Sequence, residues 1–231
     1  MSATYRPKTA LGRAIHVFEE TVIAALLGLM VLVTFVNVVL RYVFNSGLIW
    51  GLELTLILFA WLILFGIAYG FKITMHLGVD AVLNMVSRGT RRVMAIIALA
   101  ICLVYAVLLM KGAYDYWAPF ANLPPTTGHW FPTGFKEMKP WDYRGYVPTE
   151  RIPMPEILRA PLEFLFLPEG EDPYDKLPVA LPYLMIPLAV ALMLVRLVEA
   201  GLRILRGTQE SLIVSHEAED AVEEVAAKKG A

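Results

Sequence analysis

The stretch Thr21-Val-Ile-Ala-Ala-Leu-Leu-Gly-Leu-Met-Val-Leu-Val-Thr-Phe-Val-Asn-Val-Val-Leu40 runs for 20 residues without a charged side chain. A helix of this length spans about 30 Å, which matches the hydrocarbon core of a bilayer. Three further stretches are equally apolar and uncharged: 54–71, 93–110 and 177–195. We therefore expect an all-α integral membrane protein with four transmembrane helices.

The rest of the composition agrees with this fold class. Of the 231 residues, 58% are hydrophobic, against about 45–50% in soluble domains. All 20 Lys and Arg and all 21 Asp and Glu lie outside the four stretches, so the remaining sequence has a soluble-like charge content. Strand-like alternation is absent, which excludes a transmembrane barrel. A soluble globular enzyme is also excluded.

Basic residues predict the orientation. They are frequent in 1–20, in 72–92 and after the fourth stretch, whereas the loop 41–53 has only Arg41. By the positive-inside rule both termini are expected in the cytoplasm. No small-residue cleavage site follows the first stretch, so we expect a retained helix rather than a signal peptide.

Five regions are expected along the chain. Residues 1–20 form a cytoplasmic amphipathic segment that lies at the membrane interface or is simply the first turns of the first span. The others are the first three spans in 21–110 with an interfacial helix near 75–87, a periplasmic cap in 111–176, the fourth span with its basic end in 177–206, and an acidic cytoplasmic tail in 207–231.

The expected cap, 111–176, holds eleven of the 15 prolines and thirteen aromatic residues. Disordered segments are poor in aromatics, so we expect an ordered, irregular cap; a floppy loop is the alternative. Pro155 and Pro161 each precede apolar residues, which predicts the first turns of two short helices. Prolines within the fourth span predict a kink near Pro182 and Pro187.

Catalytic chemistry is not apparent. None of the four histidines lies in an uncharged stretch, which argues against a haem-binding subunit, and phosphate loops and zinc clusters are missing. Cys102 is the only cysteine and is interpreted as a small apolar filler. We expect no enzyme activity, cofactor, metal or catalytic residue. Because the spans offer few midplane polar groups, the chain is expected to support a substrate pathway rather than form one.

Polar residues gather at the two ends of the first helical hairpin, with Asn37, Arg41, Asn45, Trp50 and Glu53 at the outer end and Lys72, His76 and Asp80 at the inner end. They either anchor the helices at the interface or make specific contacts. An exposed Arg41–Glu53 pair contributes only about 0–1 kcal/mol. Gly66 and Gly70, and likewise Ala98, Cys102 and Ala106, are small residues at spacings where helices can touch; Trp61 lies near the first set.

The order of these residues resembles the small membrane subunit, DctQ type, of TRAP (tripartite ATP-independent periplasmic) transporters. The resemblance rests on Asn37-Val-Val-Leu-Arg41-Tyr42-Val-Phe44, then Trp50-Gly-Leu-Glu53, Trp61-Leu-Ile-Leu-Phe65-Gly66 and His76-Leu-Gly-Val-Asp80. These four elements cover about residues 37–80. The segment 111–176 is longer than the corresponding loop usual in this family.

The resemblance implies a scaffold subunit of a sodium-driven importer in the bacterial inner membrane. A large membrane subunit carries the substrate and sodium sites, and a periplasmic binding protein delivers an organic acid such as a C4-dicarboxylate. Arg41, Trp50 and Glu53 are then expected to hold the outer end of the scaffold and the subunit contact, and His76 and Asp80 the inner end. The cap is expected to contact the binding protein or the large subunit.

Two other functions remain open from the residues alone. The chain could be the membrane anchor subunit of an oxidoreductase complex, which a bound haem or quinone would support. It could also be a small channel or exporter that works by itself, which flux through the reconstituted chain alone would support.

Overall fold

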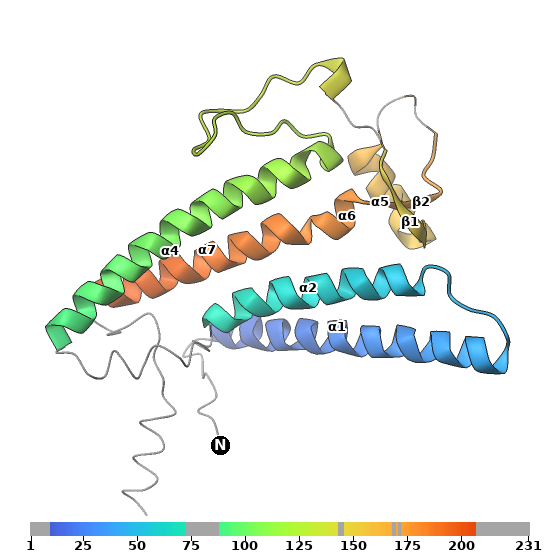
Figure 1. Cartoon of the computed structure of the whole chain (residues 1–231), viewed down its shortest axis with the longest axis horizontal. Helices are drawn as coiled ribbons and strands as arrows, with labels where there is room; N and C mark the ends of the chain where they lie inside the picture. The colour runs from blue at the N-terminus through green and yellow to red at the C-terminus, as the bar shows by residue number, and fades with distance from the viewer. Residues whose placement is uncertain (1–9, 73–87, 143–145, 168–169, 171, 207–231) are drawn as a thin grey trace, which may run out of the picture. The chain divides into compact units, whose positions relative to one another are not determined.

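The computed structural model describes residues 10–72, 88–142, 146–167, 170 and 172–206. Its long helices are α1 (Ala10–Val43), α2 (Gly51–Lys72), α4 (Arg88–Trp117) and α7 (Met185–Leu205), with the short α6 (Ala180–Tyr183) just before α7 (Figure 1). Four candidate spans result: Gly12–Val43, Gly51–Gly70, Arg92–Ala121 and Ala180–Leu202. The expected all-α membrane fold with four spans is confirmed.

The helices differ from the expected boundaries in several places. The first helix is continuous from Ala10, so its amphipathic start is part of the same helix as the span. The third helix continues to Trp117, seven residues beyond its uncharged stretch. The fourth span is interrupted at Leu184, between α6 and α7, as its prolines predict. The interfacial helix expected near 75–87 and the acidic tail lie outside the described residues.

Residues 111–176 contain regular structure after the end of α4. Two 3₁₀ turns, η1 (Ala118–Ala121) and η2 (Pro140–Asp142), precede strand β1 (Pro148–Pro153), helix α5 (Glu156–Phe166) and strand β2 (Lys176–Pro178). The strands β1 and β2 pair antiparallel, which an all-α prediction does not include. The expectation of two short helices here was wrong: α5 is a single helix, with Pro155 as its N-cap and Pro161 inside it.

The described residues separate into two compact units. Of the described residues, one unit comprises 10–20, 67–72, 88–106 and 192–206, and the other comprises those within 21–66 and 107–191, so each unit holds part of all four spans. Burial of the spans is uneven. In the most apolar window of the first span 6% of the residues are buried, against 39% in the fourth span.

A close helix approach occurs where the sequence did not indicate it. A Cβ added to Gly201 of α7 would lie 2.8 Å from Cδ2 of Leu99 on α4. By contrast, in the described part of the chain a Cβ at Gly66 or Gly70 would meet no atom within 4 Å beyond the backbone of α2 itself. Gly201 is therefore a small residue that lets α4 and α7 approach closely.

Replacing Gly201 by leucine is expected to destabilise the chain by about 1–3 kcal/mol, because the new side chain overlaps Leu99. Thermal unfolding in lipid nanodiscs measures the effect. Gly66→Leu is the matched control, since its side chain enters open space and should leave the melting temperature near that of the parent. Equal destabilisation by both substitutions would contradict this explanation.

Candidate scaffold contacts at the ends of the spans

The cap core is a cluster of apolar side chains on the two strands, α5 and the segment before β2. Its buried members are Ile152, Met154, Leu162, Tyr174 and Leu177. The partly buried residues packed against it include Trp50, Leu54 and Ile57, which belong to α2 or directly precede it. Trp50, expected at the outer end of the scaffold, therefore packs on the cap.

Polar contacts stabilise this core from the side of α5 and β2. The Tyr146 hydroxyl donates to the carbonyl of Lys176 at 2.5 Å, and its ring stacks on Tyr174 with centroids 3.9 Å apart. Burial raises the pKa of Tyr146 above its usual value. A hydrogen bond from Arg159 lowers the pKa of the Glu156 carboxyl group.

Glu53 connects α2 to the cap through its carboxylate. Its two oxygens accept hydrogen bonds from the backbone N–H groups of Glu150 and Arg151 on β1, each at 2.8 Å. Among the described residues Glu53 makes no ion pair with Arg41, whose side chain is exposed. Instead of pairing with Arg41, the Glu53 carboxylate thus binds the backbone at the edge of strand β1.

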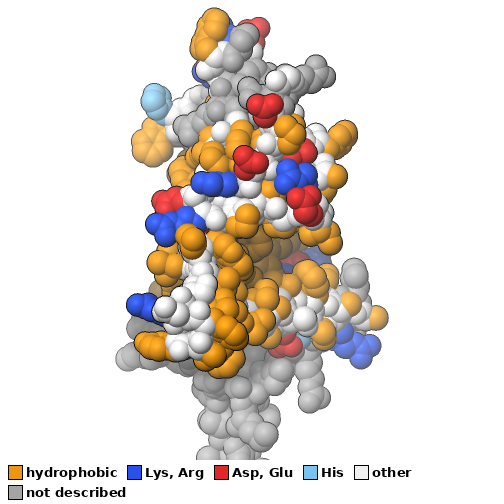
Figure 2. Space-filling view, turned by 90° about the vertical axis from the view of Figure 1, so that its right-hand side faces the viewer, with side chains coloured by type: hydrophobic (Ala, Val, Ile, Leu, Met, Phe, Trp, Pro, Cys, Tyr) orange, Lys and Arg blue, Asp and Glu red, His pale blue; other side chains and the backbone are white. Residues whose placement is uncertain are grey.

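Charged side chains are frequent on the surface of the cap. Figure 2 shows acidic and basic groups interspersed over β1, β2 and α5, whereas the end of the α1–α2 hairpin on the same face is mainly hydrophobic. The hairpin loop itself is held by Asn37, whose side-chain oxygen accepts a hydrogen bond from the backbone N–H of Leu48 at 2.9 Å. Asn45 ends α1 with a positive φ of 50°, a conformation that asparagine tolerates well.

Two tryptophans hold the short helix α6. The indole N–H of Trp61 on α2 donates to the carbonyl of Pro182 at 2.8 Å, and that of Trp117 on α4 donates to the carbonyl of Ala180, also at 2.8 Å. Both carbonyls belong to the interrupted end of the fourth span. Trp61 was a candidate from the sequence, whereas Trp117 was not singled out, because nothing in its local sequence indicates a partner 63 residues away.

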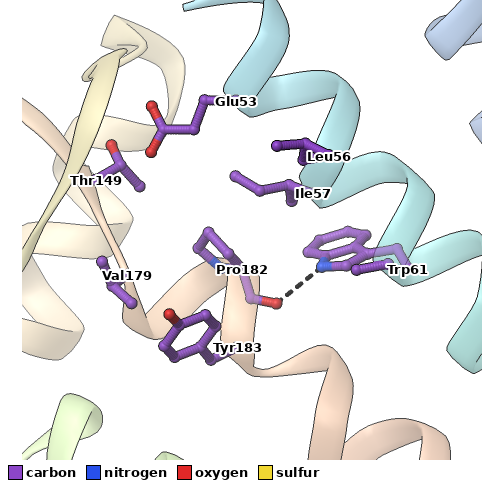
Figure 3. A pocket seen from close by; sticks show the side chains of 9 residues that line it. Glu53, Leu56, Ile57, Trp61, Thr149, Val179, Pro182 and Tyr183 are labelled. Carbon is purple, nitrogen blue, oxygen red and sulfur yellow. Dashed lines mark hydrogen bonds between the residues drawn. The ribbon is translucent and has the colours of Figure 1, made fainter.

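A cavity of about 270 Å³ lies between α2, β1 and α6. Figure 3 shows Leu56 and Ile57 from α2 on one side and Val179, Pro182 and Tyr183 on the other, with the Glu53 carboxylate beside Thr149. The Trp61 indole forms one end and is tied to Pro182 by the dashed hydrogen bond. The walls are mostly apolar, so the cavity suits an apolar group more than a small organic anion.

Trp61→Phe is expected to lower stability by about 0.6–1.5 kcal/mol, because the ring remains but the hydrogen bond to Pro182 is lost. Thermal unfolding in nanodiscs measures the loss. Trp141→Phe is the matched control, since that side chain is 75% exposed. If the two variants melt at the same temperature as the parent, the indole does not hold α6 in the way described.

Buried charge is present near the start of α1, where the sequence gave no indication of it. Arg196 on α7 contacts Glu19 on α1 at 2.5 Å, with side chains only 14% and 8% exposed. Arg196 also contacts Glu199 at 3.0 Å. Glu19 and Arg196 flank the uncharged stretches, so their partnership could not be read from a sequence separation of 177 residues.

His16 belongs to the same region and is buried. Its ring stacks on Tyr69 of α2 with centroids 6.0 Å apart, and the Tyr69 hydroxyl donates to Glu20 at 3.1 Å. These contacts join α1 to α2 through polar side chains. The inner-end candidates His76 and Asp80 lie outside the described residues, so their role stays a prediction.

The remaining candidates are less engaged within the chain. Arg41 is exposed, and the glycines at 66 and 70 have open space where a Cβ would lie. Among the described residues no group of three or more His, Cys, Asp or Glu side chains is arranged to hold a metal ion. The geometry is that of a multi-pass membrane protein in which the polar side chains described above mainly join its own helices and cap.

Comparison with known proteins places this chain within a family. The family model "Tripartite ATP-independent periplasmic transporters, DctQ component" matches residues 30–135. The C4-dicarboxylate TRAP transporter small permease protein DctQ of Vibrio cholerae is 34% identical over 220 residues, which cover 94% of this chain and 84% of that protein. The chain belongs to the DctQ family of TRAP small permease subunits.

Other relatives agree with this assignment. The protein of the same name from Pseudomonas aeruginosa is 40% identical over 134 residues, which cover 46% of this chain and 64% of that protein. A putative TRAP transporter small permease protein of Haemophilus influenzae is 29% identical over 122 residues, which cover 50% of this chain and 76% of the relative. These relatives are transporter subunits and not enzymes, and the chain is a multi-pass protein of the inner membrane.

Proposed function

We propose that the chain is the scaffold subunit of a sodium-driven TRAP importer for C4-dicarboxylates. The observation that carries this proposal is the match to the Vibrio cholerae protein named for C4-dicarboxylates, which extends over 94% of the chain. The structure is consistent with a scaffold role, because the polar side chains described above mainly join the helices to one another and to the cap. Transport itself is assigned to a large membrane subunit, supplied by a periplasmic binding protein.

Sodium-dependent uptake of labelled succinate tests this function. Cells lacking the chain should lose uptake, and a plasmid copy should restore it. Uptake should also depend on a sodium gradient and on the large subunit, which should co-purify with this chain. Normal succinate uptake in cells without the chain would overturn the scaffold role, whereas restored uptake of a different organic acid alone would overturn only the substrate.

We propose that Gly66 and Gly70 mark a contact with the large subunit. Apart from the backbone of α2 itself, a Cβ at either position would meet no atom of the described residues within 4 Å, so the face is open to another helix. Small residues favour close helix contacts in membranes. The Gly66→Leu variant, which should keep the stability of the isolated chain, is expected to retain less large subunit during purification.

The cap is proposed to face the periplasm and to contact the binding protein or the large subunit, with both termini in the cytoplasm. Two side chains on α5, Ile157 and Phe164, are each 86% exposed and lie seven residues apart, on one helix face. Their exposure leaves an apolar stripe for a partner. A reporter fusion at residue 206, after all four spans, tests the orientation: activity of a periplasmic reporter there contradicts it.

A further inference from the structure

The chain between α4 and η2 folds back along the helix it has just left. The hydroxyl of Tyr114 donates to the carbonyl of Pro124 at 3.0 Å, and its ring contacts Phe135 edge-on. Thr126 and Phe135 form an isolated antiparallel bridge, so residues 124–136 make a small hairpin, here called the return hairpin. Figure 1 shows this segment running back beside α4 toward the N-terminal end of that helix.

An ion pair on α4 fixes the return hairpin. Asp115 accepts hydrogen bonds from the backbone N–H and the hydroxyl of Thr126, at 2.7 and 2.8 Å. Lys111, one turn earlier, contacts the same carboxylate at 2.6 Å. The hairpin is thus attached to the side of the helix and not to its end.

The depth of this attachment relative to the membrane follows from the positions of the charged residues on α4. The uncharged stretch 93–110 is about 27 Å long as a helix and fills most of the hydrocarbon core, so Lys111 marks the interface. Asp115 lies about 6 Å further out. The hairpin is attached to Asp115 through Thr126 and points back along α4, and four extended residues from Thr126 reach up to about 13 Å. Its tip therefore reaches the level of Lys111.

The tip presents large aromatic side chains. Trp130 is 72% exposed and Phe131 is 60% exposed. The turn is built for this geometry, because Gly128 has a φ of 89° and a Cβ there would lie 2.4 Å from the carbonyl oxygen of Phe131. Tryptophan prefers the membrane interface, where its ring is apolar and its N–H remains near water.

We propose that the return hairpin is a membrane anchor: its tip, Trp130 and Phe131, inserts into the lipid interface beside α4. The partner of the tip is the lipid bilayer, because the hairpin turns toward the membrane from its attachment at Asp115. Asp115 lies only one helical turn beyond Lys111, which directly follows the uncharged stretch. A hairpin that served to reach a soluble protein would project away from the span. The proposal concerns the lipid contact alone and holds whichever solute the carrier transports.

Site-specific labelling tests the insertion, using Cys102→Ala as a cysteine-free background. An environment-sensitive fluorophore is attached at Trp130→Cys or Phe131→Cys in the full-length chain, purified with its bound partners in lipid nanodiscs. Glu150→Cys, an exposed position on β1, is the reference for an aqueous environment. Lipids carrying a nitroxide near the headgroup and aqueous iodide are the two quenchers.

Labels at 130 and 131 should emit at shorter wavelength than the label at 150. They should lose most of their fluorescence to the nitroxide lipid and little to iodide. Quenching by iodide as strong as at position 150 would overturn the proposal, because the tip would then lie in water. Protection from both quenchers would also overturn it and would show that a protein partner covers the tip. Two labelled positions guard against a defect peculiar to one substitution.

Discussion

Replacing Glu53 by alanine is expected to release the cap from α2 and to remove most transport activity. The carboxylate accepts two backbone N–H groups of β1, so the substitution leaves both donors without this partner. Hydrogen bonds to a charged group contribute about 1.5–3 kcal/mol. The loss should appear as a lower melting temperature and as faster protease cleavage between residues 123 and 176.

Two further variants separate this anchoring from a general effect of charge. Glu53→Gln keeps one acceptor oxygen, so its stability should lie between those of the parent and Glu53→Ala. Glu150→Ala removes an exposed carboxylate from β1 but keeps the backbone N–H that binds Glu53, and should behave like the parent. A Glu150→Ala variant as sensitive to protease as Glu53→Ala would show that the strand edge is not held through Glu53.

Arg196→Met is expected to destabilise the chain by about 3–5 kcal/mol, because Glu19 is buried and loses the guanidinium that neutralises it. The double variant Glu19→Gln with Arg196→Met should recover much of the loss, since no buried charge is then left without its counter-charge. Melting temperatures of the parent, of Arg196→Met, of Glu19→Gln and of the double variant in nanodiscs complete the double-mutant cycle.

Arg206→Met serves as the control for removing positive charge from the same end of α7. Its side chain is exposed, so stability should change little. If Arg196→Met and Arg206→Met lose the same stability, the pair with Glu19 is not what holds α1 to α7. If the double variant is as unstable as the single one, the buried charge is not the cause.

The spans could be predicted from sequence because the membrane imposes a strong and local rule. Uncharged apolar stretches of 18 to 20 residues predict membrane-spanning helices whatever the rest of the chain does, and the four stretches account for the four candidate spans. The interruption of the fourth span at Leu184 was equally local, because proline removes a backbone donor. The family resemblance followed from motifs within residues 37–80 and is confirmed by the relatives.

The contacts that join these helices could not be predicted in the same way. Glu53 was singled out, but its partners are backbone groups about 97 residues away, and backbone groups have no sequence signature. The pairing of Glu19 with Arg196 depends on which faces of α1 and α7 meet. In 111–176 the prolines predicted helix starts, whereas Pro161 lies within α5.

The slight burial of α1 implies that a substitution there can impair membrane insertion without lowering the stability of the folded protein. Because only 6% of its most apolar window is buried within this chain, packing against the other helices of the chain contributes little there, and we expect the partition of its side chains into the membrane to keep that part of the helix in place. A polar substitution at an exposed position of α1, such as Leu32→Asn, is therefore expected to act when the translocon inserts the nascent helix. Protein that is inserted correctly should have the melting temperature of the parent. The effect of the substitution should instead appear as a lower yield of membrane-inserted protein.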